Sequence, residues 1–422
     1  MAEQLSTEKE APDVIVIGAG IIGITTATEL LLMGAKVTVL DREGVAAGAS
    51  RGNAGAFAFS DAAPVASPGI MKKAPKWLFD PLGPLSVPLP YALKIAPWMY
   101  RFWRASRPDQ VRAGTAALVA LMTASRERLV PLMETTGTHN MLRQHGNLQL
   151  YESRKAFEEN LPMWREREAR GVKFTALTSP EEIAEHQPGI DRRFVGAIHT
   201  NDWYGISDPK DYTTALSTFF ESRGGTIRIA EASALEAVSG GVSVVLSDGT
   251  RLSADQIVVA AGAWSHRLAK TLGDHIPLET ERGYNTTLPV GAFDLKRQLS
   301  FEEHGFVVSP LSSGIRVGGA VELGGLNLPP NYRRADALLK KAKSFLPGLK
   351  TEGGTQWMGF RPSLPDSIPV IGPASATNRI IYAFGHGHLG LTQSAGTARI
   401  VANLVMGREN TVDLAPYRPQ RF

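Results

Sequence analysis

Three glycines near the start of the chain have the spacing of a phosphate-binding turn. Gly18, Gly20 and Gly23 follow the apolar run 14–17 and open an apolar stretch of helical character. Gly18 permits a tight turn, Gly20 lets the backbone approach a pyrophosphate, and Gly23 lets the helix lie close to the strand. The N-terminus of such a helix presents unpaired N–H groups and a partial positive charge to the phosphates.

A carboxylate stands at the distance that such a site requires. The second apolar run, 36–40, ends on Asp41, eighteen residues after Gly23, where it can accept hydrogen bonds from ribose hydroxyls. Ala27 and Gly34 are small enough to let the helix pack on a sheet. Because 42 of the 422 residues are glycine, the glycines alone would also fit an ordinary βαβ unit. Together with the acid, they predict a dinucleotide site.

Two further glycine-rich segments could contact the same ligand. The segment 48–55 offers Ser50 and Asn53 as polar contacts for a flat or phosphorylated molecule, although a surface loop would look the same. The segment 385–390 opens a predicted helix over 391–406, whose N-terminus could stabilise the negative charge of a reduced flavin. A plain strand-to-helix turn explains this segment equally well.

Four side chains in the second half of the chain could act on a substrate. Arg361 precedes a proline, and a guanidinium is the natural bidentate clamp for a carboxylate, although most arginines are surface residues. Tyr284 could donate its hydroxyl to the same carboxylate, or it is a half-buried strand tyrosine. His386 and His388 flank the second glycine turn and could contact a ring, a substrate, or only the fold. No metal-ligand set or Ser/His/Asp triad stands out, so no metal is expected.

The composition indicates a globular protein of two domains. Of the 422 residues, 43% are hydrophobic and 20% charged, and the formal charge is +4, without a basic run suited to nucleic acid. The absence of cysteine excludes disulfides, thiolate metal sites and cysteine-linked flavin. Residues 1–12 are polar, unlike a signal peptide, and the apolar stretch 14–32 fits burial under a sheet better than a membrane span. A cytoplasmic setting is expected.

The rest of the sequence must supply elements that hold these groups. Hydrophobic periodicity predicts helices over 110–136 and 156–170, a helix beginning after Ser207 with Tyr212, Leu216, Phe219 and Phe220 inward, and a helix over 336–345. Strands are predicted at 146–152, 195–199, 226–229, in a hairpin around 247–249, and at 256–262, 277–289, 306–310, 314–321 and 380–384.

One amphipathic stretch, 91–104, has two interpretations. An apolar stripe at helical spacing, with Pro97 at the helix start, is flanked by cations: Ile95, Trp98, Met99 and Phe102 beside Lys94, Arg101 and Arg104. It could be an interfacial helix that touches a membrane holding an electron acceptor. A cap helix packed on a substrate domain is the simpler interpretation, and we favour it.

Jointly, the motifs resemble the FAD-dependent D-amino-acid oxidase superfamily and lie nearest to its D-amino-acid dehydrogenase branch. The resemblance rests on the first glycine turn with Asp41 and on the segments 49–55, 260–265, 359–372 and 385–392, supported by the Asp208-Pro209 helix start. It implies an α/β plus α+β fold, in which a glutathione-reductase-type FAD-binding parallel sheet is interleaved with an antiparallel-sheet substrate domain. The FAD domain would comprise 13–70, 206–275 and 357–422, and the cap and substrate domain 71–205 and 276–356.

The resemblance also assigns residues to the cofactor and the substrate. FAD should be held without a covalent bond, because the chain has no cysteine and Arg51-Gly52 offers no histidine for a linkage. Arg361, Tyr284 and His388 would serve the substrate, and the backbone of Ala232 would face the adenine. The cofactor contacts would be Gly18, Gly20, Ile22, Gly23, Asp41, Arg42, Ala49, Ser50, Asn53, Ala54, Gly55, Ala232, Ala261, Gly262, Trp264, Arg361, Gly387, His388, Leu389, Gly390, Leu391 and Thr392.

The activity that the resemblance implies is oxidation of an amino acid. Hydride transfer from the substrate Cα to flavin N5 would give an imino acid, with a D-amino acid as substrate, including cyclic ones such as D-proline or hydroxy-D-proline. Electrons would pass to a quinone, an electron-transfer chain or O2. The alternatives are a glycine or N-methyl amino acid (sarcosine-type) oxidase and a non-catalytic FAD-binding subunit. If 91–104 touches a membrane, the protein would be peripheral on its cytoplasmic face.

Overall fold

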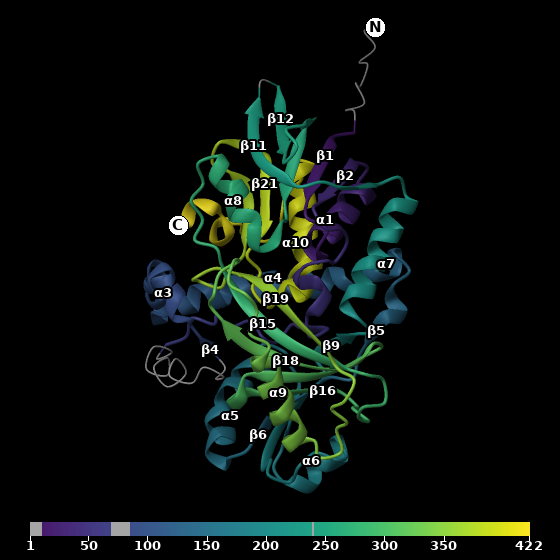
Figure 1. Cartoon of the computed structure of the whole chain (residues 1–422), viewed down its shortest axis with the longest axis vertical. Helices are drawn as coiled ribbons and strands as arrows, with labels where there is room; N and C mark the ends of the chain where they lie inside the picture. Colours follow the sequence, from purple (N-terminus) through teal and green to yellow (C-terminus); the bar gives the residue numbers. More distant parts are fainter. Residues whose placement is uncertain (1–10, 69–84, 239) are drawn as a thin grey trace.

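The computed structural model describes residues 11–68, 85–238 and 240–422, and these form two lobes joined along a broad waist (Figure 1). The predicted boundary between residues 70 and 71 lies outside the described residues. Among the described residues, no helix is both long and apolar enough to cross a membrane.

The first lobe is built on a mainly parallel sheet. Six strands of the described residues pair in the order β10 (Thr226–Ile229), β2 (Lys36–Asp41), β1 (Asp13–Ile17), β14 (Gln256–Val259), β21 (Thr377–Phe384) and β20 (Val370–Ala374). Only the last pair of strands is antiparallel. The predicted third parallel strand, 226–229, pairs with β2 as expected.

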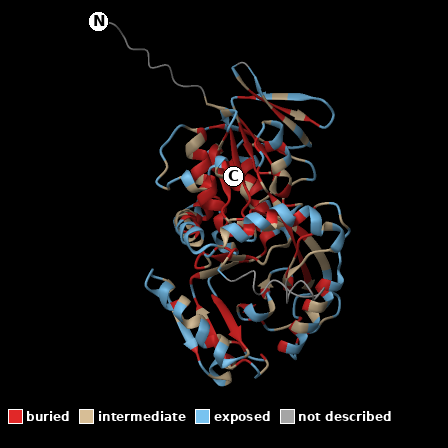
Figure 2. Ribbon diagram, turned by 90° about the vertical axis from the view of Figure 1, so that its left-hand side faces the viewer, coloured by how far each residue is buried: buried red, intermediate tan, exposed pale blue. Residues whose placement is uncertain are grey.

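Alternation along the central strand divides the core of this lobe into two layers. Val14 and Val16 face one hydrophobic cluster, whereas Ile15 and Ile17 face another. The first cluster contains helices α1 (Ile21–Leu32), α4 (Pro108–Thr135), α7 (Pro209–Ser222) and α10 (Gly390–Val405). The second contains α8 (Ser265–Thr271) and the small sheet β11 (Ala232–Val238), β12 (Gly241–Leu246) and β13 (Arg251–Ala254). Figure 2 shows buried residues concentrated in these strands and in the helices against them.

A buried carboxylate ties three helices of the first layer together. Glu29 of α1 has no exposed surface and pairs with Arg128 of α4 and, at 3.2 Å, with Arg399 of α10. Because a buried charge is costly unless it is paired, this contact fixes α4 on the first lobe although its sequence neighbours belong to the second.

The second lobe is a large, mostly antiparallel sheet. Nine strands of the described residues form it: β19 (Thr355–Ser363), β15 (Glu279–Leu288), β18 (Gly314–Glu322), β17 (Phe306–Leu311), β16 (Gln298–Phe301), β6 (Asn147–Tyr151), β8 (Gly196–Thr200) and β7 (Phe174–Leu177), with β4 (Leu85–Ser86) beside β18. Its faces are covered by α6 (Pro180–His186) and α9 (Arg333–Phe345) on one side and α5 (Arg154–Glu168) on the other. A three-stranded sheet of β3 (Ala56–Ala58), β9 (Trp203–Ile206) and β5 (Leu142–Arg143) lies near the waist.

Two details of the predicted helices are wrong. The helix α3 (Ala92–Ala105) begins before Pro97, which lies inside it, because the preceding short turn at 89–91 already starts the helical path. Burial of Ile95, Trp98 and Phe102 offsets the missing proline N–H, and α3 packs its apolar stripe inward, as the cap interpretation expects. Phe219 is only half-buried and lies under Arg223, because helical spacing places 212, 216 and 220 on the inner face.

Candidate active site

A cavity of about 1130 Å³ lies between the lobes. Its lining comes from the C-terminal ends of the parallel strands, the N-termini of α1 and α10, and the face formed by β15, β18 and β19. In open α/β sheets the carboxyl ends of the strands are where ligands bind, and here the second sheet closes the opposite side.

The first glycine turn is as tight as the motif requires. Gly18 has φ +112°, and a Cβ there would lie 2.3 Å from the carbonyl oxygen of Ala260. A Cβ on Gly23 would lie 1.8 Å from the oxygen of Gly18, so Gly23 serves the contact between helix and strand. Gly20 is the N-cap of α1 without a side-chain cap, and it lines the cavity. Ser50 accepts from the first N–H of the helix, at Ile21, and the remaining N–H groups of this N-terminus are available to an anionic ligand.

The polar residues predicted beside this turn hold its backbone. Oδ2 of Asp41 accepts from the N–H of Ala19 at 2.7 Å, and Ser50 Oγ accepts from the N–H of Ile21 at 2.8 Å. Both residues line the cavity, so they can meet a ligand while they order the turn.

The far end of the cavity suits an adenine. The guanidinium of Arg42 lies 3.8 Å from the ring centroid of Trp264, a close cation–π contact. Ala232, Ala261 and Gly262 line the same end. Small residues flanked by a flat arginine–tryptophan pair leave room for a planar base.

The second glycine turn leads into α10. Gly387 has φ +54°, which few residues other than glycine adopt, and its N–H donates to Pro362 O at 2.7 Å. Thr392 ties the first turn of the helix to β3, because its Oγ1 accepts from the N–H of Ala58 at 3.0 Å. His386 is buried and contacts Thr397 at 3.0 Å, and burial lowers its pKa to about 3, so its ring is neutral.

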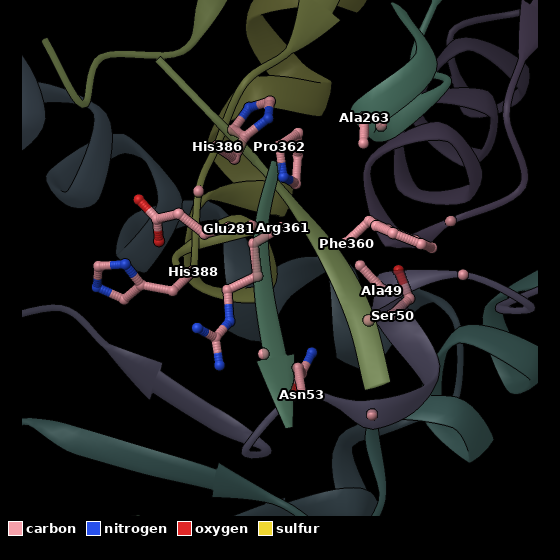
Figure 3. Close-up of a pocket in the computed structure, with 18 of the residues that line it drawn as sticks. Ala49, Ser50, Asn53, Ala263, Glu281, Phe360, Arg361, Pro362, His386 and His388 are labelled. Atoms are coloured by element: carbon pink, nitrogen blue, oxygen red, sulfur yellow. The ribbon is translucent and has the colours of Figure 1, made fainter. Parts of the chain in front are cut away.

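Arg361 extends into the cavity from β19 beside Glu281 and His388 (Figure 3). Its Nη1 donates to the carbonyl oxygen of Ala320 at 3.0 Å, and its guanidinium lies against Gly283, where a Cβ would be 2.2 Å from Nη2. Burial lowers the pKa of Arg361 and nearby Glu281 opposes that effect, but a guanidinium keeps its charge. In the described chain it makes no ion pair, so its remaining donors are available to a ligand.

A bulge in the sheet brings the Ala320 carbonyl to Arg361. Two residues of β18, Ala320 and Val321, oppose the single Gly283 of β15, and Ala320 has φ +56°.

Tyr284 follows Gly283 in β15 and lines the cavity, but its hydroxyl donates to Glu322 Oε1 at 3.0 Å. That carboxylate is also paired with buried Arg282 at 2.7 Å, which fixes the position of the Tyr284 ring.

His388 forms a charged pair at the cavity wall. Its Nε2 lies 3.9 Å from Oδ2 of Asp61, whose Oδ1 lies 3.6 Å from Arg167. Burial lowers the pKa of His388, but Asp61 more than offsets this, so the pKa of His388 is raised above its ordinary value. Burial likewise raises the pKa of Asp61, but His388 and Arg167 outweigh it and the pKa is lowered. The pair can accept or hold a proton beside Arg361.

The loop that carries Ser50 and Asn53 is held by the second lobe. Asn285 Nδ2 donates to Gly52 O at 2.8 Å, and Arg316 Nη1 donates to Asn53 O at 2.7 Å. The ring of Trp357 lies so close to Gly52 that a Cβ there would be 2.1 Å from it. The geometry of this cavity wall therefore depends on strands far away in the sequence.

Most of the predicted site residues line this one cavity. Gly23 does not, since it packs against Gly18, and Gly55 lines a smaller cavity behind the loop. The lining includes Gly18, Gly20, Ile22, Asp41, Arg42, Ala49, Ser50, Asn53, Ala54, Ala232, Ala261, Gly262, Trp264, Tyr284, Arg361, Gly387, His388, Leu389, Gly390, Leu391 and Thr392. Residues not anticipated as lining include Asp61, Glu281, Gln298, Ser300, Trp357 and Phe360. Of these, Glu281 and Phe360 carried a signal, because Glu281 stands three residues before Tyr284 and Phe360 directly precedes Arg361.

The residues present fit FAD. Two helix N-termini without side-chain N-caps, those of α1 and α10, open into one cavity, and neither first turn contains an acid. FAD matches this pair of positive helix ends, because its central pyrophosphate would meet the N-terminus of α1 and its isoalloxazine, which is negatively charged when reduced, would meet the N-terminus of α10. The Arg42–Trp264 pair suits the adenine, and Arg361, Glu281 and His388 form a polar group elsewhere in the same cavity.

Comparisons with known proteins agree with this geometry. A D-amino-acid oxidase of Bradyrhizobium diazoefficiens is 34% identical over 98% of this chain and 99% of its own length. A D-amino acid dehydrogenase of Rhizobium johnstonii is 33% identical over 95% of this chain and 97% of its own. The crystal structure of glycine oxidase from Geobacillus kaustophilus superposes with a TM-score of 0.75 at 22% identity, covering 98% of this chain and 100% of that one.

A family model described as FAD dependent oxidoreductase (DAO) matches residues 13–404. The fold, the cavity with its paired helix N-termini and these relatives lead to one conclusion. The chain belongs to the DAO family of FAD-dependent oxidoreductases, and it is a flavoenzyme that acts on amino acids.

Proposed function

We propose that this enzyme oxidises a D-amino acid to the corresponding imino acid, and that water then converts the imino acid of a primary amine to a 2-oxo acid and ammonia. The observation that carries the proposal is the charged, half-buried Arg361, held by Ala320 and Gly283 but without a carboxylate partner in the described chain. The carboxylate of a bound substrate would supply the missing partner of Arg361. Because the two curated relatives above are D-amino-acid enzymes, we favour that configuration.

Each residue of the substrate end then has a role. Arg361 binds the carboxylate and so aims the Cα–H at the cofactor, with Tyr284 as a wall of the pocket. His388, supported by Asp61, accepts a proton from the substrate ammonium, since hydride loss from Cα requires the amine nitrogen to hold its lone pair. When bound, FAD supplies the hydride acceptor at N5, and we expect it to be non-covalent because the chain lacks cysteine. The proposal includes cyclic substrates such as D-proline, whose oxidation would give a cyclic imine.

A glycine or N-methyl amino acid remains the alternative substrate, because such molecules carry the same carboxylate and a similar amine. Bleaching of the yellow holoenzyme under anaerobic conditions by a panel of D-, L-, cyclic and N-methyl amino acids distinguishes the two. Hydrogen peroxide formed in air would identify O2 as an acceptor and the protein as an oxidase rather than a dehydrogenase.

We further propose that α3 contacts a membrane surface and that the acceptor is an apolar quinone. The outer face of α3 carries Leu93, 91% exposed, and Trp103, 46% exposed, and the preceding Leu89 is 90% exposed. Residues 92–107 contain four cations and no acid. Trp98 and Phe102 on the inner face line the large cavity, so one helix borders both the solvent and the active site.

Substitutions of Arg361 and Gly283 test the carboxylate clamp. Arg361→Ala should keep FAD but lose about three orders of magnitude in kcat/KM for amino acids, as expected when one partner of a buried charge pair is removed. Gly283→Ala should keep fold and FAD as well, because only the flexible end of Arg361 needs to move, yet lower kcat/KM about a hundredfold through misplacement. The matched control is Gly348→Ala, at an exposed turn that does not line the cavity, where the added Cβ would make only an ordinary contact with Phe293 at 3.4 Å. Near-wild-type kcat/KM in Arg361→Ala would disprove the clamp.

A further inference from the structure

A second cavity, of about 270 Å³, borders the loop 49–55 at Ala54 and Gly55. It has no part in the reaction proposed above. It shares only Ala54 and Gln298 with the large cavity. The described residues that line it include Arg143, Lys296 and Arg297, and no carboxylate. A concave site with cations and no acid has the electrostatics of an anion site.

Arg297 contributes a positive charge to this cavity that no carboxylate in the lining balances. Its Nη1 contacts His199 Nε2 at 2.7 Å, and its Nε is buried without a hydrogen-bond partner in the described chain. Burial lowers the pKa of Arg297, but the guanidinium remains charged. A partly buried cation without a counter-ion is costly, and an anion in the cavity would remove that cost.

The neighbouring imidazole does not balance the charge. Burial, followed by the charge of Arg297, lowers the pKa of His199 to about 4, so the ring is neutral and accepts a hydrogen bond from Arg297. His186, whose ring centroid lies 4.8 Å from that of His199, has its pKa lowered by the same two causes. His199 therefore holds Arg297 in place, and neither imidazole compensates its charge.

The mouth of the cavity adds a second fixed cation. Arg143 Nη1 donates to the carbonyl oxygens of Asn140 at 2.6 Å and Leu142 at 3.1 Å, which orient its guanidinium. Lys296 is already paired with Asp294 at 2.8 Å, so the surplus charge comes from Arg143 and Arg297. Serine and tyrosine hydroxyls complete the polar lining, at Tyr204, Ser207, Ser309 and Ser312.

We propose that this cavity binds a small oxyanion, a carboxylate or a phosphate, between Arg143 and Arg297. Two guanidinium groups and nearby hydroxyls match the several acceptor oxygens of such a ligand. The site shares only Ala54 and Gln298 with the large cavity, and Arg361 does not line it, so it is distinct from the position where Arg361 would hold a substrate.

Titration of the holoenzyme with inorganic phosphate or with malonate, at ionic strength held constant with NaCl, tests the proposal. Saturable heat of binding and a Tm that rises with ligand concentration are expected for the wild type. The same results are expected for Arg361→Ala, which lacks the substrate clamp, and for Arg192→Gln, a matched change of an arginine whose side chain is 80% exposed. Arg297→Gln should weaken binding at least tenfold.

Arg143→Gln changes an exposed residue at the mouth of the second cavity and should also weaken binding of the anion. This variant keeps the test decisive if Arg297→Gln does not fold. A response to phosphate alone would identify a phosphoryl ligand, and a response to malonate alone a carboxylate. The proposal is overturned if neither anion binds saturably, or if both variants bind as tightly as the wild type.

Discussion

The pKa of His388, the base in the proposed reaction, depends on burial and on the carboxylates near it, of which Asp61 has the larger effect and Glu281 the smaller. The imidazole of His388 faces the cavity with 43% of its side chain exposed in the absence of ligand, so its protonation state depends on Asp61 at 3.9 Å. The carboxylate raises the pKa of His388 although burial lowers it. A base needs the neutral ring, and therefore kcat/KM should rise as pH increases through this raised pKa.

Asp61→Asn tests this assignment. Asp61 contributes most of the effect that raises the pKa of His388, and only the smaller effect of Glu281 remains in the variant, so the pKa should fall and the inflection in kcat/KM against pH should move to lower pH, with FAD content unchanged. The measurement is the pH profile of anaerobic flavin reduction, compared with Glu181→Gln, an exposed acid outside the cavity, which should leave the profile unchanged. An unshifted inflection in Asp61→Asn would mean that another group, such as the substrate amine, controls the profile.

At the scale of elements, the loop 49–55 depends on the second lobe. Asn285 and Arg316 donate to two successive carbonyls of the loop, at Gly52 and Asn53, from neighbouring antiparallel strands. Arg316 is itself buried and lies 3.8 Å from Asp208, the N-cap of α7. The second lobe therefore orders the loop 49–55, which lines the cavity, as well as the surroundings of Arg361.

Asn285→Ala should weaken FAD binding. The change leaves the Gly52 carbonyl without its partner, and an unsatisfied buried group costs ~1–3 kcal/mol, so the Kd for FAD should rise about tenfold. Fluorescence titration of the apoprotein measures this value. Asn403→Ala removes a comparable bond from side chain to backbone at the far end of α10 and should leave the Kd unchanged. Equal Kd values in the two variants would show that the loop holds its shape without the second lobe.

Local sequence signals predicted the elements whose geometry depends on near neighbours. The β1–α1–β2 unit, the hairpin at β12–β13, and α7 with its Asp208 cap follow from periodicity, glycine and capping residues. Arg361 was identified because it stands in a constrained motif, but its support by Ala320 arises from a bulge between β15 and β18. No local pattern encodes such a register shift.

The missed elements depend on distant partners. β16 pairs in parallel with β6, which lies about 150 residues earlier, and the short β3 and β5 exist only because β9 lies between them. Their lengths of two to four residues carry too little periodicity to be read from sequence. The partnership of Asp61 with His388 was missed for the same reason, since 327 residues separate the two.

At the scale of the whole molecule, α3 lies at the outer edge of the waist (Figure 1) and its exposed face combines apolar and cationic side chains. Leu89, Leu93 and Trp103 would enter the boundary between lipid headgroups and acyl chains, while Lys94 and Arg101 would meet anionic headgroups. The two contributions act through different forces. Apolar burial resists salt, whereas attraction to anionic lipid weakens as salt increases.

Leu93→Glu should lower binding of the holoenzyme to vesicles of phosphatidylglycerol and phosphatidylcholine about tenfold or more, because full burial of a leucine contributes ~1.5–3 kcal/mol. Lys94→Gln should weaken binding mainly at low salt. Val290→Glu, which replaces another strongly exposed apolar residue on the second lobe, is the matched control and should bind like the wild type. Cosedimentation measures all three. If Leu93→Glu and Val290→Glu partition equally, α3 is only a cap over the cavity, and the apolar acceptor must approach the flavin by another route.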